Sequence, residues 1–213
     1  LQPAETPERF AEAMSQLERF TASDITVLLT GLVPPGKGNN TAIEYAANSY
    51  SFHVLAPGKE RYRATFIQGA IDALQLVTDK DNRGFIIQLL QQAGDDTAVD
   101  ALTPYLLDGY LSEKASRALS RIGTLVAGKR LLEALNGAPD SLAVNLIDGI
   151  GFMAYAPAEE IVRAHAGSRD INVRKAVWYA LSRIGSPESA PVLAKAAADA
   201  GYVYEPSGAT AAY

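Results

Sequence analysis

The sequence predicts an all-α fold made of repeated helix pairs. Three observations predict it: apolar residues recur at helical spacing, a glycine follows each apolar stripe, and one hexapeptide occurs twice. The composition agrees, because 48% of the 213 residues are hydrophobic but only 8% are aromatic, and alanine and leucine supply much of the apolar total.

The repeated hexapeptide sets the length of the repeat. Ala-Leu-Ser-Arg-Ile-Gly occupies residues 118–123 and again residues 180–185. Related segments at 89–94 and 146–151 also end in glycine. The four glycines, separated by 29, 28 and 34 residues, are Gly94, Gly123, Gly151 and Gly185. Their spacing predicts a repeat of about 31 residues.

Each repeat is expected to contain two helices. The first helix of the last repeat shows a single apolar stripe, formed by Val173, Ala176, Val177, Ala180, Leu181 and Ile184. The glycine after each stripe lies where a helix C-cap favours left-handed backbone. A second helix follows each glycine, and Ser186-Pro187-Glu188 predicts the start of the last one. Pro104 falls inside another second helix, where we expect a kink rather than a break.

Residues 1–80 lack the glycine spacing but still predict helices, at 7–20, from 23 or 24 to 33, at 41–55 and at 58–77. We interpret residues 1–80 as diverged helix pairs at the start of the same array. About four further pairs are expected in 81–200, and 201–213 looks like the beginning of another, truncated repeat. We therefore expect the chain to be a segment of a longer protein.

Residues 170–193 carry the most specific pattern. Asp170 precedes Val173-Arg174, alanines and a leucine follow, Gly185 makes a turn, and the second helix contains a proline and leucines. This pattern resembles a unit of the HEAT-like repeat family, and looser copies extend back to residue 83. The resemblance implies an α-α superhelix, a right-handed HEAT-like solenoid of antiparallel helix pairs. Such solenoids usually serve as scaffolds that bind other macromolecules.

Composition excludes several function classes. The absence of cysteine excludes disulfide scaffolds and thiolate zinc sites. Two histidines are too few for a metal-dependent HEAT-like hydroxylase, so we expect no metal and no cofactor. The net charge of -5 disfavours nucleic acid as a partner. No stretch approaches the roughly 20 apolar residues of a membrane-spanning helix, so we expect no membrane insertion.

Two motifs imitate ligand-binding loops. Residues 31–38 fit the first part of a phosphate-binding loop, but two prolines remove backbone donors and Gly38 replaces the required hydroxyl residue. Residues 79–84 begin like a calcium loop, yet Leu90 stands where that loop needs a glutamate. Both segments are better interpreted as turns between helices, the second with Asp81 or Asn82 as the helix cap.

Five residues are candidates for partner binding. Arg121 and Arg183 occupy equivalent positions two repeats apart, although Gln92 and Gly149 interrupt the basic stripe at the matching positions. Trp178, the only tryptophan, is placed by the helical period on the flank or outside of its helix. It has two readings: burial against the helix of a neighbouring repeat, or an exposed anchor for a partner. Tyr202 and Tyr204 could join it.

The leading interpretation is a non-catalytic module, a protein-interaction scaffold or spacer within a larger protein. One alternative is an enzyme with a pocket at the N-terminal helices, using Lys37, Asn39, Asn40, Tyr45 and His53. A second alternative is a nucleic-acid binder that uses the basic face from Arg117 to Lys175.

We expect a protein partner and a monomer or weak oligomer. The loop at 34–41, together with the repeats, resembles helical segments of exported bacterial proteins, which favours an exported or periplasmic location over a cytoplasmic one.

Overall fold

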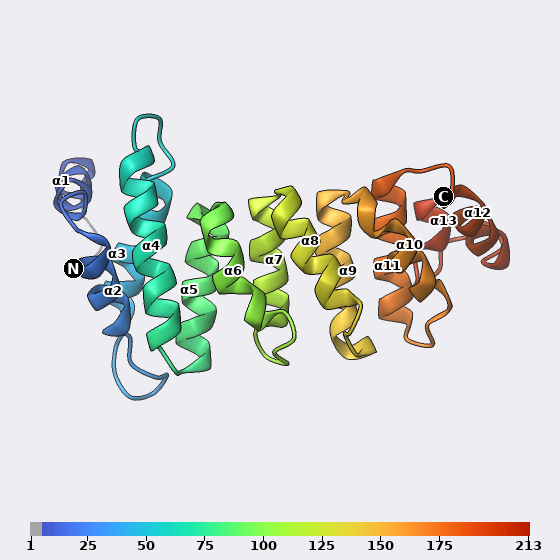
Figure 1. Cartoon of the computed structure of the whole chain (residues 1–213), viewed down its shortest axis with the longest axis horizontal. Helices are drawn as coiled ribbons and strands as arrows, with labels where there is room; N and C mark the ends of the chain where they lie inside the picture. The colour runs from blue at the N-terminus through green and yellow to red at the C-terminus, as the bar shows by residue number, and fades with distance from the viewer. Residues whose placement is uncertain (1–5) are drawn as a thin grey trace. The chain divides into compact units, whose positions relative to one another are not determined.

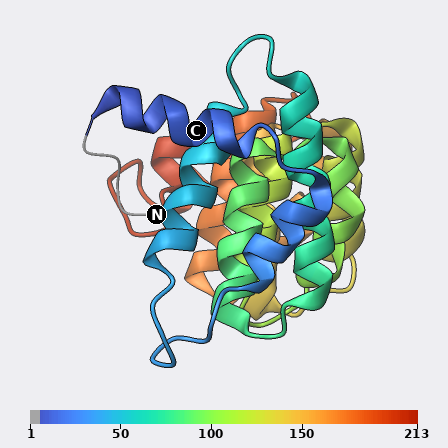
Figure 2. The same cartoon turned by 90° about the vertical axis from the view of Figure 1, so that its left-hand side faces the viewer.

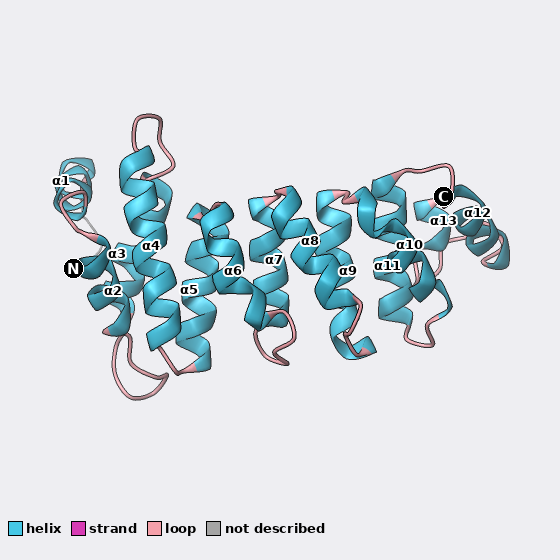
Figure 3. Cartoon of the chain, in the orientation of Figure 1, coloured by secondary structure: helices cyan, strands magenta, loops and turns pink. Residues whose placement is uncertain are grey.

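The computed structural model describes residues 6–213, and these residues form helices and loops without a strand (Figures 1 and 3). The all-α fold of a helical repeat protein, predicted from the sequence, is confirmed. The chain divides into two compact units, unit 1 at residues 1–103 and unit 2 at residues 104–213. Within residues 6–213, no helix is both long enough and apolar enough to span a bilayer.

Unit 1 is a stack of helices whose bounds are α1 (Pro7–Leu17), α2 (Ala22–Thr30), α3 (Thr41–His53), α4 (Glu60–Leu76), α5 (Lys80–Ala93), η1 (Asp96–Ala98) and α6 (Val99–Leu102). The α2–α3 loop and the α3–α4 loop project from opposite ends of the helices of unit 1 (Figures 1 and 2). Helix α4 lies at the centre, packed against α2 on one side and α5 on the other. Among the described residues of unit 1, Tyr50 of α3 and Phe66 of α4 are the largest fully buried side chains, and their rings meet edge to face.

A glycine allows α2 and α4 to pack closely. A Cβ atom at Gly69 of α4 would lie 2.5 Å from the Ile25 side chain and 2.6 Å from the Ala22 carbonyl oxygen of α2. The Thr26 hydroxyl donates to the Gly69 carbonyl at 3.2 Å. The helices therefore touch backbone to side chain at this crossing.

Unit 2 contains the clearest helix pairs. Their bounds are α7 (Ser112–Ile122), α8 (Leu125–Leu135), α9 (Asp140–Met153), η3 (Ala156–Ala158), α10 (Glu159–Ala164), η4 (His165–Gly167), α11 (Ile171–Ile184), α12 (Ala190–Asp199) and α13 (Ala209–Ala212). The first helices of the pairs, α7, α9 and α11, pack side by side, while α8 packs against α7 and α9. The apolar stripe predicted in the last repeat is buried except for the half-buried Ile184 at its end. Its fully buried members, at 0% exposure, are Val173, Val177, Ala180 and Leu181.

The repeated glycines differ in what they do. Gly123 and Gly185 end α7 and α11 with φ of 74° and 68°, so the predicted left-handed C-caps are confirmed there. The prediction is wrong for Gly94, which caps α5 in extended backbone. It is also wrong for Gly151, which lies inside α9 because that helix continues to Met153. A Cβ at Gly151 would lie 2.8 Å from the Ala180 Cα, so this glycine permits close packing of α9 on α11.

Three predicted helix boundaries need correction. Helix α6 ends at Leu102 and a 3₁₀ turn, η2 (Thr103–Tyr105), contains Pro104, so the proline breaks the helix rather than kinking it. The predicted start at residues 186–188 is a turn, and α12 begins at Ala190. Asp79 caps α5, accepting from the Asn82 amide at 3.0 Å, in place of Asp81 or Asn82.

Candidate functional site

The first helices of unit 2 each present one side to solvent. Each first helix buries one stripe and leaves the opposite stripe in solvent. We call this surface the first-helix face; its residues are Glu113, Arg117, Arg121, Asp148, Phe152, Lys175 and Tyr179.

The register between the helices sets the order of these residues. Asn145 Nδ2 donates to the Ser112 hydroxyl at 3.3 Å, and a Cβ at Gly149 would lie 2.8 Å from the Ser116 hydroxyl. Because both contacts advance by four residues, α7 and α9 run parallel. Arg121 therefore lies one turn beyond Arg117 in the same direction as Phe152 lies beyond Asp148.

The first row of the face carries charges. Asp148 on α9 lies between Arg117 of α7 and Lys175 of α11. Partial desolvation of the Asp148 carboxyl raises its pKa, while Lys175 and Arg117 oppose the rise. Arg117 also contacts Glu113 on its own helix, with 3.0 Å between Nε and Oε1. The charges in this row are partly balanced within the face.

The second row, one turn further along, carries aromatic rings. Phe152 is 53% exposed and Tyr179 is 41% exposed. The two rings come from neighbouring helices, since a Cβ at Gly151, next to Phe152, would lie 3.0 Å from Tyr179 Cδ1. Arg121 completes the row from α7 and is exposed. Aromatic and arginine side chains of this kind supply most binding energy at protein interfaces.

The five predicted binding residues do not come together. Arg121 belongs to the first-helix face, and Arg183 is exposed in the last turn of α11. Tyr202 and Tyr204 are 60% and 94% exposed in the loop after α12, where the Tyr202 ring lies against Tyr213. Trp178 is only 6% exposed.

Trp178 points toward the C-terminal end of unit 2. Its Nε1 donates to the Ser207 hydroxyl at 3.2 Å. The reading in which this tryptophan is buried is therefore confirmed, although the cover comes from the segment before α13. Trp178 also lines an open cleft of about 660 Å³ between α11, α12 and that segment.

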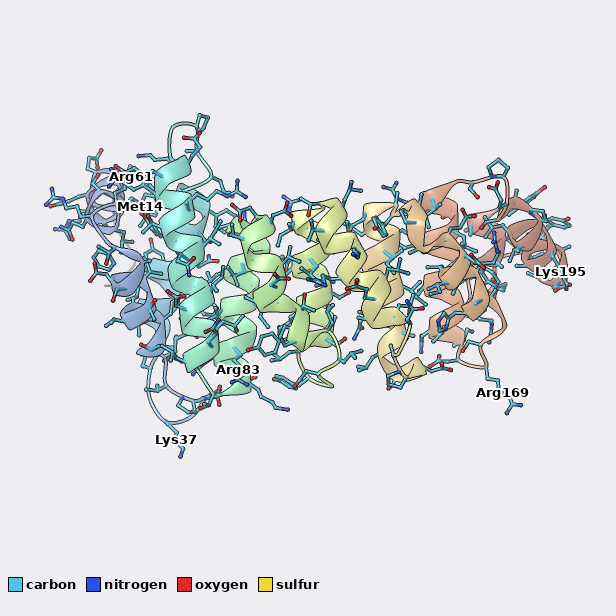
Figure 4. All side chains as sticks on the ribbon, in the orientation of Figure 1. Met14, Lys37, Arg61, Arg83, Arg169 and Lys195 are labelled. Carbon is cyan, nitrogen blue, oxygen red and sulfur yellow. The ribbon has the colours of Figure 1, made fainter. Side chains whose placement is uncertain are left out.

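The residues of the predicted enzyme pocket lie apart in unit 1. Asn39 and Asn40 precede α3 and His53 ends it, so Asn40 and His53 are separated by about 20 Å at 1.5 Å per residue. Lys37 is exposed at the tip of the α2–α3 loop and points away from the helices (Figure 4). The preceding segment is helix α2, not the strand that a phosphate-binding loop requires.

His53 does have a carboxylate partner. Its Nε2 lies 2.8 Å from Glu18 Oε1, and the same oxygen accepts from Lys59 Nζ. Hydrogen bonds from His53 and then from Lys59 hold the pKa of Glu18 below its usual range. This pair connects the end of α1 to α3 and to the residue before α4. Its geometry is that of an inter-helix contact, since Glu18 Oε1 is engaged by both His53 Nε2 and Lys59 Nζ.

Asn40 holds the α2–α3 loop closed. Its side-chain amide accepts from the Val33 amide at 2.9 Å and donates to the Val33 carbonyl at 2.8 Å. Asn39, Asn40, Glu44 and Asn82 line a shallow cleft of about 490 Å³ beside this loop. Among residues 6–213, no group of three His, Asp or Glu side chains is placed to hold a metal ion.

Comparison with known families identifies the repeat. Residues 128–205 match the family described as HEAT repeats. This segment belongs to the HEAT repeat family. The HEAT segment covers α9 to α12 and includes Phe152, Lys175, Tyr179 and Trp178. A comparison with curated proteins found no match.

Sequence reasoning missed both aromatic residues of the first-helix face, Phe152 and Tyr179. Phe152 directly follows Gly151, the glycine expected to end its helix, and Tyr179 directly precedes Ala180 of a predicted buried stripe. A single aromatic residue at either position carries no sign of exposure. The available signal was the shared spacing, because Asp148 and Phe152 are four residues apart, as are Lys175 and Tyr179.

Proposed function

We propose that this chain is a non-catalytic protein-interaction module, a scaffold or spacer, that binds its partner through the first-helix face. The observation that carries the proposal is the exposed pair of rings, Phe152 and Tyr179, on neighbouring helices of the HEAT segment. HEAT repeats typically mediate protein interactions, and stacked repeats present extended surfaces suited to that role.

The charges of the face favour a protein over a nucleic acid. A phosphate backbone requires a continuous set of unpaired cations. Here Glu113 pairs with Arg117 and Asp148 interrupts the first row. On α8, Lys129 and Arg130 both contact Glu133. A mixed surface with two aromatic anchors instead matches a protein segment that offers an acidic residue beside apolar side chains.

A capture experiment with two variants tests the proposal. The chain is immobilised and bound proteins from the cells that produce it are quantified by mass spectrometry. We expect Phe152→Ala combined with Tyr179→Ala to weaken partner binding by about 30-fold or more, the effect of losing a hot spot. Both side chains are exposed, so the fold should persist.

Leu125→Ala is the matched control, because Leu125 is 77% exposed on the second helix α8, outside the first-helix face. It should leave the captured proteins unchanged. Equal capture by all three chains would show that the first-helix face is not the interface.

A further inference from the structure

The cleft beside Trp178 has the size of a small-molecule site. Its volume of about 660 Å³ lies within the range of roughly 300–1,000 Å³ that ligand pockets occupy. Its apolar lining comes from α11, from α12 with its C-cap, and from the first residue of α13, namely Trp178, Pro191, Val192, Ala196, Ala200 and Ala209. The cleft lies wholly within unit 2 and is formed by other side chains than the first-helix face.

Three of the four charged side chains at the cleft are already engaged. Lys195 Nζ pairs with Asp199 Oδ2 at 2.5 Å, and Lys195 projects outward on α12 (Figure 4). The Glu205 carboxylate accepts from the Ser207 amide at 2.7 Å, the Ser207 hydroxyl at 2.8 Å and the Ala209 amide at 2.7 Å.

Arg174 is the charged side chain with donors left over. Its Nη1 donates to the carbonyl oxygens of Ser168 and Arg169, at 2.7 and 3.2 Å. These two bonds hold the guanidinium in place at the lining of the cleft. Its Nε and Nη2 groups have no hydrogen-bond partner among residues 6–213. A guanidinium held in this way presents further N–H groups to an anion, and carboxylate is the anion whose geometry it matches.

We propose that this cleft binds an amphiphilic carboxylate, a medium-chain fatty acid, with the carboxylate on Arg174 and the alkyl chain against Trp178, Val192 and Ala196. The apolar walls supply affinity that grows with chain length, and the arginine supplies selectivity for the acid. This site is independent of the proposed protein-binding function.

The only tryptophan of the chain reports on the cleft directly. Trp178 emission is followed while the 213-residue chain is titrated with octanoate, decanoate or dodecanoate, each below its micelle concentration, or with decanol below its solubility limit. We expect the dissociation constant to fall about fourfold for each added methylene until the cleft is filled. Decanol should bind at least about tenfold more weakly than decanoate, because it lacks the charge-assisted hydrogen bonds.

Two variant pairs locate the site. Ala196→Leu places a larger side chain in the cleft and should abolish binding, whereas Ala198→Leu, exposed on the same helix outside the cleft, should not. Arg174→Gln should weaken decanoate binding about tenfold or more and leave decanol binding unchanged. Arg183→Gln, on the same helix, is its control.

The proposal is overturned by unchanged Trp178 emission with all four ligands, by equal binding of decanoate and decanol, or by an Ala196→Leu chain that still binds. A stronger response to N-acetyl-leucine than to decanoate would assign the cleft to a peptide C-terminus and also overturn it. If Arg174→Gln unfolds because the loop at 168–169 loses its anchor, the Ala196→Leu and Ala198→Leu pair still decides the question.

Discussion

Residues at matching positions of the repeat have different structural roles, and the glycines show this most clearly. Gly185 supplies the left-handed backbone that ends α11, with φ of 68°. Gly151, at the matching position one repeat earlier, is helical and makes room for Ala180. Gly185 can cap its helix because positive φ costs glycine little, and Gly151 allows close packing because glycine has no Cβ.

Substituting Gly151 tests the packing role. Gly151→Ala places a methyl group 2.8 Å from the Ala180 Cα, which is backbone and cannot turn aside. We expect the free energy of unfolding to fall by about 1–3 kcal/mol, the usual cost of overpacking, measured by urea denaturation. At Gly137 no atom lies within 4 Å of an added Cβ, so Gly137→Ala should be neutral or stabilise by up to about 1 kcal/mol. Equal stability of the two variants would contradict this role.

Glu18 should make the stability of the chain depend on pH. Its pKa is lowered from 4.5 in the folded chain by the hydrogen bonds from His53 and Lys59. A carboxyl group whose pKa is lowered by folding stabilises the fold above its unfolded value, and the stabilisation is lost as the pH falls through the folded value.

The test compares melting temperatures of the unaltered chain and Glu18→Gln between pH 7 and pH 3. We expect the unaltered chain to melt higher at pH 7 and the difference to shrink as the pH falls below about 4.5 and through the lower pKa that Glu18 has in the folded chain. A difference that stays constant over this range would show that the Glu18 charge contributes nothing to stability.

Backbone groups at helix ends in this chain are hydrogen-bonded by side chains from neighbouring helices as well as by local caps. Thr21 and Asp24 form a capping box at the start of α2, a purely local device. At the end of α5 the partner is distant in sequence. Arg63 of α4 donates from Nε to the Ala93 carbonyl and from Nη2 to the Gly94 carbonyl, both at 2.7 Å. These bonds satisfy the orphan carbonyls left by the helix end.

Arg63 is therefore expected to matter more than a neighbouring arginine on the same helix. Arg63→Ala should lower the free energy of unfolding by about 1.5–3 kcal/mol, since it removes charge-assisted bonds to two backbone carbonyls. Arg61 is exposed, and Arg61→Ala should change stability by no more than about 0.5 kcal/mol. Denaturation of both variants in urea gives the comparison; similar losses would mean that Arg63 acts only through its general charge.

The chain as a whole consists of two compact units, each with its own buried core. In helical repeat proteins each repeat contacts chiefly its neighbours, so a group of complete repeats can fold without the remainder. Unit 2 contains the HEAT segment and the stacked helices α7, α9 and α11.

Residues 104–213 expressed alone should therefore fold. We expect a helical circular dichroism spectrum and a cooperative urea transition, as for a small single domain. Trp178 should stay protected from quenching by acrylamide, because the Ser207 contact lies within the same unit. A non-cooperative transition would show that unit 2 depends on residues of unit 1.

The sequence was enough to predict the helices but not most of the candidate site. Arg121 was predicted as a binding residue, because its hexapeptide recurs in the sequence. Phe152 and Tyr179 were not, since their approach depends on how far α9 is shifted along α11. That shift is set by Gly151 against Ala180, a contact between residues 29 positions apart.

Local chemistry was enough to determine the all-α class, the repeat length and most helix ranges, because helical periodicity and turn residues act over a few positions. Packing between helices decided which glycines cap and which make room, that Trp178 is covered by Ser207, and that His53 meets Glu18 rather than Asn39 or Asn40. These outcomes depend on contacts between distant residues, whose register no stretch of local sequence encodes.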